Sequence, residues 1–323
     1  MSLTEPLKLQ VDALHRPVTD VLVLDLVAAG GDDLPAWEPG AHLELEVGAG
    51  VIRHYSLCGD SVDPGRWRIA VLREPEGRGG SRLLHESLEV GAPLVVHRVL
   101  QRFTMPARPS YVFLAGGIGI TPIAAMVARA EAEGADWRLY YLGRSRDRMY
   151  LADELERRWP ERVVVHPSEE RGRLDLTALV GALPDGTSLV CCGPDGLTHQ
   201  AGAAARARGL DFHHESFGAD PLADSPDDGG HHTGPESFEV ELASTGAVVP
   251  VGADQTVLDA VADAGAIVVS SCREGYCGTC ETAVLAGAVD HRDTVLTPEE
   301  QQDATVMMIC VSRSLGPRLV LDL

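Results

Sequence analysis

Four cysteines near the C-terminus have the spacing of an iron–sulfur site. Cys272, Cys277 and Cys280 form the pattern C-x4-C-x2-C, and Cys310 follows them further along the chain. This is the ligand spacing of plant-type [2Fe–2S] clusters, in which four thiolates converge on two irons. A structural zinc site is the alternative, but zinc ligands usually come as two short C-x2-C pairs, and here the fourth cysteine stands alone. We therefore expect a [2Fe–2S] cluster.

The segments around these cysteines predict a ferredoxin-like α+β domain of the β-grasp kind. Glycines at 275 and 278 let the ligand loop wrap closely enough for backbone N–H groups to reach the sulfides, and Ser270 and Ser271 are further candidate donors. Residues 238–242 and 248–251 predict a hairpin, 257–265 a helix, 297–300 a capping box that opens a second helix, and 319–323 a final strand. The buried face of the first helix would be Val257, Leu258, Val261 and Ala262.

A glycine loop in the middle of the chain predicts a dinucleotide site. AGGIGITP (115–122) follows an apolar strand at 111–115 and opens a helix expected over 122–133. It is not the G-x-G-x-x-G fingerprint, but glycines and a helix N-terminus would again let a pyrophosphate approach the backbone. CCGPDGL (191–197) ends a later strand, and the two segments should meet at the carboxyl edge of one sheet. The nucleotide contacts expected here are Gly116, Gly117, Gly119, Thr121, Cys192, Gly193 and Pro194.

The turn Arg144-Ser145-Arg146 follows the strand 139–143, where the adenine ribose would lie. An acid at that place would bind the 2′-hydroxyl of NADH, whereas a hydroxyl and two guanidiniums suit the 2′-phosphate of NADPH. A solvated turn is an equally good interpretation.

Two segments of the first hundred residues could hold a flavin phosphate. IRHYSLC (52–58) offers Arg53 as a cation, and Tyr55 and Ser56 as neighbours of the ring. GRGGS (77–81) runs into a helical pattern and would form an anion site at a helix N-terminus. Each segment alone could be an ordinary strand or turn, but their order ahead of a dinucleotide unit favours a flavin site.

Three kinds of element must position these sites. Up to residue 105, short alternating strands such as 42–47 and 67–71 predict an antiparallel β-barrel. Residues 106–218 alternate strand and helix, which predicts a parallel α/β sheet. Residues 219–236 are rich in Asp, Gly and Pro and predict a linker, and residues 237–323 form the ferredoxin domain.

Charge and composition exclude several classes of function. The 323 residues carry 27 Lys+Arg against 48 Asp+Glu, a net charge of −21, which argues against nucleic-acid binding and against docking on an anionic membrane. We find no secretion signal and no membrane span in the sequence, and the odd cysteine count of 7 favours a cytoplasmic cofactor protein over a disulfide framework.

RHYSL, GRGGS, GGIGITP, CCGP, HESFG and the ferredoxin cysteines, in this order, resemble the phthalate dioxygenase reductase family, which includes vanillate demethylase reductase subunits. The resemblance implies an FMN barrel, an NAD(P)H domain and a plant-type ferredoxin domain. It implies Phe217 against the flavin ring, with Ser56 and Cys192 beside the reacting atoms. His54 stands where a threonine is common, and the GRSR turn replaces an acid-containing one. The implied FMN contacts are Arg53, His54, Tyr55, Ser56, Ala70, Val71, Arg73, Gly79, Gly80, Ser81 and Phe217.

The resemblance also implies an electron pathway from NAD(P)H through FMN and the cluster to a terminal oxygenase. We expect a Rieske-type dioxygenase or O-demethylase as acceptor, with a haem-thiolate monooxygenase as the nearest alternative. An FAD-dependent reductase and a non-catalytic zinc-stabilised binding module are more distant alternatives. We expect a monomer whose acidic ferredoxin domain meets a basic patch on its partner.

Overall fold

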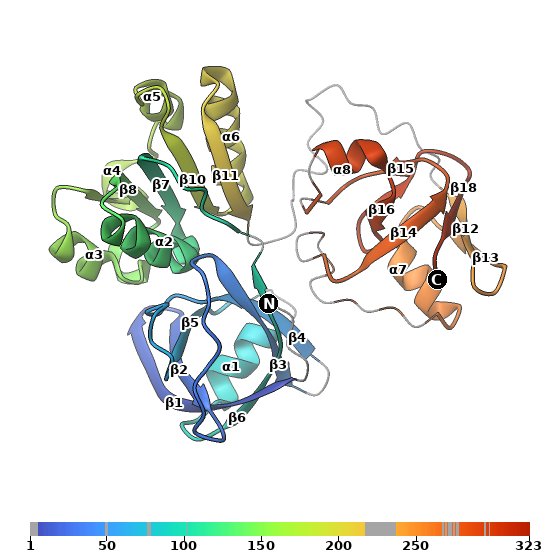
Figure 1. The fold of residues 1–323 in the computed structure, drawn as a ribbon, viewed down its shortest axis with the longest axis horizontal. Coiled ribbons are helices and arrows are strands. Elements are labelled where there is room, and N and C mark those ends of the chain that lie inside the picture. The colour runs from blue at the N-terminus through green and yellow to red at the C-terminus, as the bar shows by residue number, and fades with distance from the viewer. Residues whose placement is uncertain are drawn as a thin grey trace. The chain divides into compact units, whose positions relative to one another are not determined.

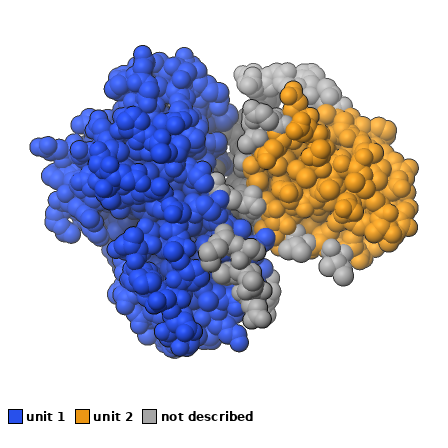
Figure 2. Space-filling model, in the orientation of Figure 1, with its two compact units in different colours: residues 1–217 blue, residues 218–323 orange. Residues whose placement is uncertain are grey.

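The computed structural model describes residues 6–48, 51–75, 79–101, 103–216, 237–266, 268, 270, 273, 275, 278–293, 295–296 and 298–323. The chain divides into two compact units, Met1–Phe217 and Gly218–Leu323 (Figures 1 and 2). Each unit has its own hydrophobic core, and each is described here by itself.

The N-terminal part of the first unit is a six-stranded antiparallel sheet with the strand order β4-β3-β6-β1-β2-β5. A bridge between Leu57 and Ile69 brings the end of β4 against β5 and closes the sheet into a barrel. One helix, α1 (Gly80–Ser87), packs against β3, β4 and β5. The strands are β1 (Leu7–Val18), β2 (Val21–Ala28), β3 (Ala41–Gly48), β4 (Val51–Ser56), β5 (Trp67–Leu72) and β6 (Pro93–Gln101).

The alternation in the sequence selects the inner face of this barrel correctly. Leu43, Leu45, Trp67 and Ile69 are fully buried in its core. The outer face of β3 also carries buried polar side chains, because Glu44 and its neighbour His42 are buried there. Glu44 is tolerated because Arg98 binds both of its carboxylate oxygens, at 2.8 and 3.2 Å.

The second part of the first unit is a five-stranded parallel sheet with the order β11-β10-β7-β8-β9. Helices α2 (Ile120–Ala132) and α3 (Ala152–Arg158) bury their apolar residues on one face, and α5 (Leu176–Gly181) and α6 (Asp195–Arg208) on the other (Figure 1). The strands are β7 (Ser110–Gly116), β8 (Asp136–Gly143), β9 (Val163–Pro167), β10 (Ser188–Gly193) and β11 (Asp211–Ser216). The remaining elements are the 3₁₀ turns η1 (Gly117–Gly119) and η2 (Arg146–Arg148) and the single turn α4 (Ser168–Arg171).

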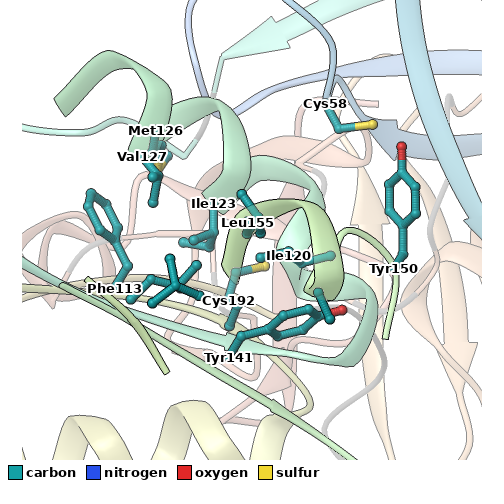
Figure 3. Packing of buried hydrophobic residues seen from close by; sticks show 14 of the residues in the cluster. Cys58, Phe113, Ile120, Ile123, Met126, Val127, Tyr141, Tyr150, Leu155 and Cys192 are labelled. Atoms are coloured by element: carbon teal, nitrogen blue, oxygen red, sulfur yellow. The ribbon is translucent and has the colours of Figure 1, made fainter. Parts of the chain in front are cut away.

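The barrel and the parallel sheet share one hydrophobic core. Cys58 and Ala70 of the barrel lie in the same cluster as Ile120, Met126 and Tyr150 of the nucleotide side. Figure 3 shows the Cys58 thiol directed at the Tyr150 hydroxyl, with which it hydrogen-bonds. Burial raises the pKa of Cys58 to about 12, so this thiol stays neutral and serves packing.

The second unit has a mixed sheet with the order β13-β12-β18-β14-β16. The predicted hairpin is present as β12 (Phe238–Leu242) and β13 (Ala247–Val251), and the C-terminal β18 (Arg318–Leu321) pairs in parallel with β12. This is the β-grasp arrangement expected from the sequence, with α7 (Val257–Asp263) against the sheet. The other elements are β14 (Glu281–Ala286), β15 (Val289–Asp290), α8 (Pro298–Asp303), β16 (Val306–Met308) and β17 (Arg313–Ser314).

The structure corrects three details of the sequence interpretation. In α7, Ala260 is buried and Ala262 is exposed, because at 100° per residue position 262 falls outside the arc centred on Val257 and Val261. Helix α2 begins at Ile120, after η1, so Pro122 is its third residue and not its first. Strand β11 was missed because its sequence DFHHES is polar.

No helix in the described part of the chain is long and apolar enough to span a membrane.

Candidate flavin, nucleotide and iron–sulfur sites

A cradle for an anionic group lies where β4 meets the start of α1. The Arg53 side chain runs along the first turn of α1, since a Cβ on Gly80 would lie only 2.7 Å from Arg53 Nε. The N-cap residue, Gly79, supplies no side-chain hydrogen bond to this turn. The first turn therefore presents its N–H groups beside a guanidinium, which suits a phosphate. Ser81 lies in the same turn, and its hydroxyl accepts a hydrogen bond from the Glu74 N–H.

The polar edge expected for a flavin ring lies at the end of β4. Ser56 is buried, and its hydroxyl oxygen has no hydrogen-bond partner among the described residues. A buried hydroxyl without a hydrogen-bond partner destabilises the fold unless a ligand or a water molecule bonds to it. Burial also raises the pKa of the neighbouring Tyr55, so its phenol stays protonated. The Arg53 cradle and the Ser56 hydroxyl together fit the phosphate and the ring edge of FMN.

The other predicted flavin contacts lie around the same strands. Val71 packs inside the barrel, and its carbonyl accepts a hydrogen bond from His85 Nε2 at 2.9 Å, while Ala70 faces the shared core. Arg73 is engaged with Glu86 of α1 at 2.8 Å. Only the backbone of Ala70 and Val71 is therefore available to a ligand, and Arg73 would have to exchange its partner to reach a phosphate.

A row of titratable side chains near this edge was not predicted from the sequence, apart from His54. His42 Nδ1 lies 3.8 Å from Glu215 Oε1, and its ring centroid is 5.2 Å from that of His54. His54 in turn lies 3.9 Å from Glu44. Burial raises the pKa of Glu215 to about 8, so this carboxyl holds a proton at neutral pH. The HESFG motif contained Glu215, but only the parallel pairing of β11 with β10 places it opposite Cys192.

The glycine loop and the CGP segment meet at the carboxyl edge of the parallel sheet, as expected. Gly119 packs so closely against the carbonyl of Cys192 that no side chain fits between them, and Gly116 touches Pro194 and Gly193. The Cys192 thiol points away from this contact into the core beside Ile120 and Tyr141 (Figure 3). Burial holds the pKa of Cys192 well above its usual value, so the thiol is not a nucleophile.

A hollow of about 160 Å³ opens beside the glycine loop, between the barrel and the parallel sheet. Its walls are mainly apolar, and two arginines, Arg144 and Arg148, are among the lining residues. Thr121 does not line it: this residue is buried, and its hydroxyl donates to the carbonyl of Ile118. The lining residues are Val21, Leu72, Gly117, Ile118, Gly143, Arg144, Arg148, Met149 and Tyr150.

Both guanidiniums of the GRSR turn are engaged with acids of the same unit. Arg144 is 79% exposed and binds Glu169 at 2.8 Å. Arg146 binds two acids of α3, Asp153 at 2.8 Å and Glu156 at 2.5 Å. Ser145 hydrogen-bonds to Asp147 and so helps hold the pKa of that carboxyl below its usual value. The turn is therefore less positive than its sequence suggests.

Two of the four predicted cluster ligands lie in the described part of the second unit. Cys280 and Cys310 are both buried in its core. The Cys280 carbonyl accepts a hydrogen bond from the N–H of Ile309, which brings the two ligand segments side by side. Thiolates are the donors that an iron–sulfur cluster requires, so two cysteines on neighbouring segments fit it. Cys272, Cys277, Phe217, Ser271 and the capping residue Thr297 lie outside the described residues.

A flavin-type barrel joined to a parallel nucleotide-binding sheet and followed by a β-grasp ferredoxin unit defines a class of protein: a modular flavin and iron–sulfur reductase. Comparison with known proteins supports this class. The family model of the 2Fe-2S iron-sulfur cluster binding domain matches residues 240–315 of this chain. Phenoxybenzoate dioxygenase subunit beta of Ectopseudomonas oleovorans is 41% identical over 322 residues, 98% of each chain. Vanillate O-demethylase oxidoreductase of Pseudomonas sp. is 37% identical over 321 residues, 97% of this chain and 98% of the other.

Solved structures also match nearly the whole chain, and the two described here each cover 98% of it. Phthalate dioxygenase reductase, 33% identical, superposes with a TM-score of 0.73 and is itself covered over 98% of its length. An intact type IV self-sufficient cytochrome P450 monooxygenase is 41% identical with a TM-score of 0.84, but this chain spans only 41% of it. The chain belongs to the phthalate dioxygenase reductase family. The fold class and the cofactor set expected from the sequence (FMN, NADH and a [2Fe–2S] cluster) are thereby confirmed.

Proposed function

We propose that this chain is the reductase component of an oxygenase system, which takes hydride from NADH onto FMN and delivers single electrons through a [2Fe–2S] cluster to a terminal oxygenase. The observation that carries the proposal is the order of three sites along one chain. A phosphate cradle with a buried, unsatisfied Ser56 hydroxyl precedes a glycine-lined sheet edge, and buried ferredoxin cysteines follow. FMN accepts an electron pair and releases single electrons, which the cluster carries onward.

The residues of the first unit bind and orient. Arg53 and the first turn of α1 would hold the FMN phosphate, while the Ser56 hydroxyl would hydrogen-bond to the polar edge of the ring and so orient it. The close contact of Gly119 with Cys192 keeps the sheet edge free of side chains, so that the NADH pyrophosphate reaches the N-terminus of α2. Glu215 holds a proton on its carboxyl beside His42. Phe217 would cover the ring until the nicotinamide arrives.

In this proposal residues 1–105 bind FMN, residues 106–218 bind the nucleotide and residues 237–323 hold the cluster, with 219–236 as the linker. The remaining predicted contacts keep their roles as proposals. These are His54, Tyr55, Ala70, Val71, Arg73, Gly79 and Ser81 for FMN, Gly116, Gly117, Thr121, Arg144, Ser145, Gly193 and Pro194 for NADH, and Cys272, Cys277, Cys280 and Cys310 for iron.

The proposed acceptor is a Rieske-type oxygenase, because a dioxygenase subunit and an O-demethylase oxidoreductase match this chain over nearly their whole lengths. A haem-thiolate monooxygenase is the second candidate, favoured by the 41% identity to part of a P450 monooxygenase chain. We also propose that the protein acts as a monomer in the cytoplasm, where a reducing environment suits a cysteine-ligated cofactor.

An anaerobic titration of the holoprotein with NADH tests the proposal. Flavin and iron–sulfur absorbance should bleach together, and the reduced protein should then be reoxidised by a purified Rieske oxygenase. Protein that contains flavin and iron but bleaches with neither NADH nor NADPH would overturn the assignment. Faster reoxidation by a P450 than by the Rieske oxygenase would select the second acceptor.

A further inference from the structure

The turn after β15 contains an aspartate whose side chain is fully buried. The side chain of Asp293 is 0% exposed. Its Oδ2 accepts hydrogen bonds from the backbone N–H groups of Val295, at 3.2 Å, and Leu296, at 2.9 Å. Burying a carboxylate is costly, and these two bonds explain only one of its oxygens.

The other oxygen of Asp293 reaches the segment that carries the fourth cysteine. Oδ1 accepts a hydrogen bond from the Ser312 hydroxyl at 3.2 Å, and the Ser312 oxygen itself accepts from the N–H of Arg292 at 3.2 Å. Ser312 is 1% exposed and lies two residues after Cys310, which is also buried. The carboxylate and the hydroxyl thus tie the 291–296 turn to the Cys310 segment.

The backbone of Asp293 touches the loop that carries the other ligands. A Cβ on Gly275 would lie 3.2 Å from Asp293 Cα and 2.6 Å from Val311 Cγ2, and Gly275 has a φ of +73°. The Asp293 carbonyl also accepts from Gln301 Nε2 of α8 at 3.4 Å. One residue therefore contacts both the ligand loop and the segment after Cys310.

The charged and titratable surroundings of Asp293 are sparse. His291 Nδ1 lies 3.5 Å from its Oδ1, and neither ring nitrogen of His291 has a hydrogen-bond partner among the described residues. The guanidinium of Arg292 is turned to Asp290, at 2.6 Å. No described guanidinium or lysine ammonium therefore forms an ion pair with the Asp293 carboxylate.

We propose that Asp293 is a positioning residue for the iron–sulfur site: it holds the ligand loop against the Cys310 segment, and its negative charge disfavours reduction of the cluster. The inference rests on the proposed [2Fe–2S] centre. The net charge around a cluster and the hydrogen bonds near its sulfurs are known determinants of reduction potential. Neither the cysteine spacing nor the fold assigns this role to position 293.

The Asp293→Asn variant tests the charge without deleting the turn. The amide oxygen can still accept from Val295 and Leu296, while the amide nitrogen faces Ser312 and the charge is gone. In the full-length holoprotein we expect the reduction equilibrium of the cluster to become about tenfold more favourable, about 59 mV for one electron. The EPR signal of the reduced cluster should shift, and the FMN midpoint should not. Asp322→Asn, which removes an exposed carboxylate of the same unit, is the matched control and should change neither.

The Ser312→Ala variant tests the link while keeping the charge. We expect faster loss of iron to a chelator and an altered EPR signal, with both turn hydrogen bonds of Asp293 preserved. If the Asp293→Asn variant does not retain iron, the rate of iron release from the Ser312→Ala variant decides whether the inference holds. A potential and an EPR signal identical to those of the parent in Asp293→Asn, or unchanged iron release in Ser312→Ala, would overturn the inference. A parent protein that lacks the cluster signal would instead refute the proposed function.

Discussion

At the scale of single residues, the clearest indications of function are buried polar atoms that lack a hydrogen-bond partner. Ser56 Oγ and Glu215 Oε2 both lack a hydrogen-bond partner within the described residues. Ser56 lies at the end of β4, and Glu215 lies on β11 with its Oε1 3.8 Å from His42 Nδ1. Such atoms destabilise the fold unless a ligand or water binds them, so they mark where a ligand belongs.

Replacing Ser56 with alanine should slow reduction of the bound flavin by NADH about tenfold, which corresponds to about one hydrogen bond. The physical reason is the loss of the hydroxyl that, in our proposal, would hold the polar edge of the ring. Stopped-flow absorbance under anaerobic conditions measures the rate. Ser87→Ala, an exposed serine at the other end of α1, is the control. An unchanged rate in Ser56→Ala would remove this serine from the flavin site.

Glu169→Gln should shift the nucleotide preference toward NADPH. Glu169 binds the exposed Arg144 at 2.8 Å, a surface pair that contributes little to stability, and releasing it frees a guanidinium for a 2′-phosphate. We expect the KM for NADPH to fall several-fold, about 1 kcal/mol of binding, with the KM for NADH nearly constant. Glu170→Gln removes the same charge one residue away and keeps the pair. Equal effects of the two variants would contradict a specific role for Arg144.

Glu215 makes the stability of the first unit depend on pH. Its pKa is raised by burial from an ordinary value of 4.5 to about 8 in the folded protein. Between these values the folded state binds more protons than the unfolded state, so stability falls as pH rises from about 5 to about 8 and levels off above that.

Glu215→Gln imitates the protonated carboxyl and should remove this dependence. The temperature at which flavin is released, measured at pH 5, 6, 7 and 8, should fall more steeply with pH in the parent than in the variant. Parallel profiles for the two proteins would show that Glu215 is not desolvated in the folded state.

At the scale of elements, helix α1 contributes through its first turn. The apolar residues of this helix do little more than attach it to the barrel, where Leu84 is buried. Its proposed contribution to function is the first-turn N–H groups beside Arg53, an arrangement that requires the absence of a side chain at Gly80.

Gly80→Ala should weaken FMN binding about tenfold, about 1.4 kcal/mol, although alanine favours helix formation. The new methyl group would lie 2.7 Å from Arg53 Nε and displace the guanidinium. Titration of the apoprotein with FMN, followed by flavin fluorescence, gives the dissociation constant. Gly181→Ala, in α5, adds a methyl group with no neighbour within 4 Å and should leave it unchanged.

At the scale of the whole molecule, the charge is unevenly distributed. Residues 237–323 contain 13 acids and four arginines, a net charge of −9 of the total −21. Much of this charge is exposed, and like charges on a small unit repel any acidic partner. The acceptor should therefore present a basic patch, and electrostatic attraction should speed the encounter.

Electron transfer to the terminal oxygenase should slow markedly as ionic strength rises from about 0.01 to 0.15 M, because the Debye length falls from about 30 to about 8 Å. The internal reduction of FMN by NADH, measured under the same conditions, is the control and should change much less. A rate of transfer independent of salt would exclude electrostatic docking through this acidic unit.

Local patterns were sufficient for the architecture. Three sequence patterns each reflect a local requirement. The cysteine spacing reflects ligand geometry, and the apolar strands 111–115 and 188–192 reflect burial on both faces of a sheet. The alternation in 67–71 reflects burial on one face. For that reason the barrel, the parallel sheet and the β-grasp unit with its cluster were predictable from local patterns, whereas FMN was expected only from the resemblance to a known family.

Only the tertiary structure decided which side chains within those elements are free to act. The guanidiniums of Arg144 and Arg146 looked available in sequence, yet Glu169, Asp153 and Glu156, brought in from other elements, already bind them. No pattern in the sequence singled out Asp293, whose side chain is fully buried and bonded to Ser312, a residue 19 positions away. Pairing between residues distant in sequence depends on how elements cross and pack, and that information is carried by the folded molecule and not by local spacing.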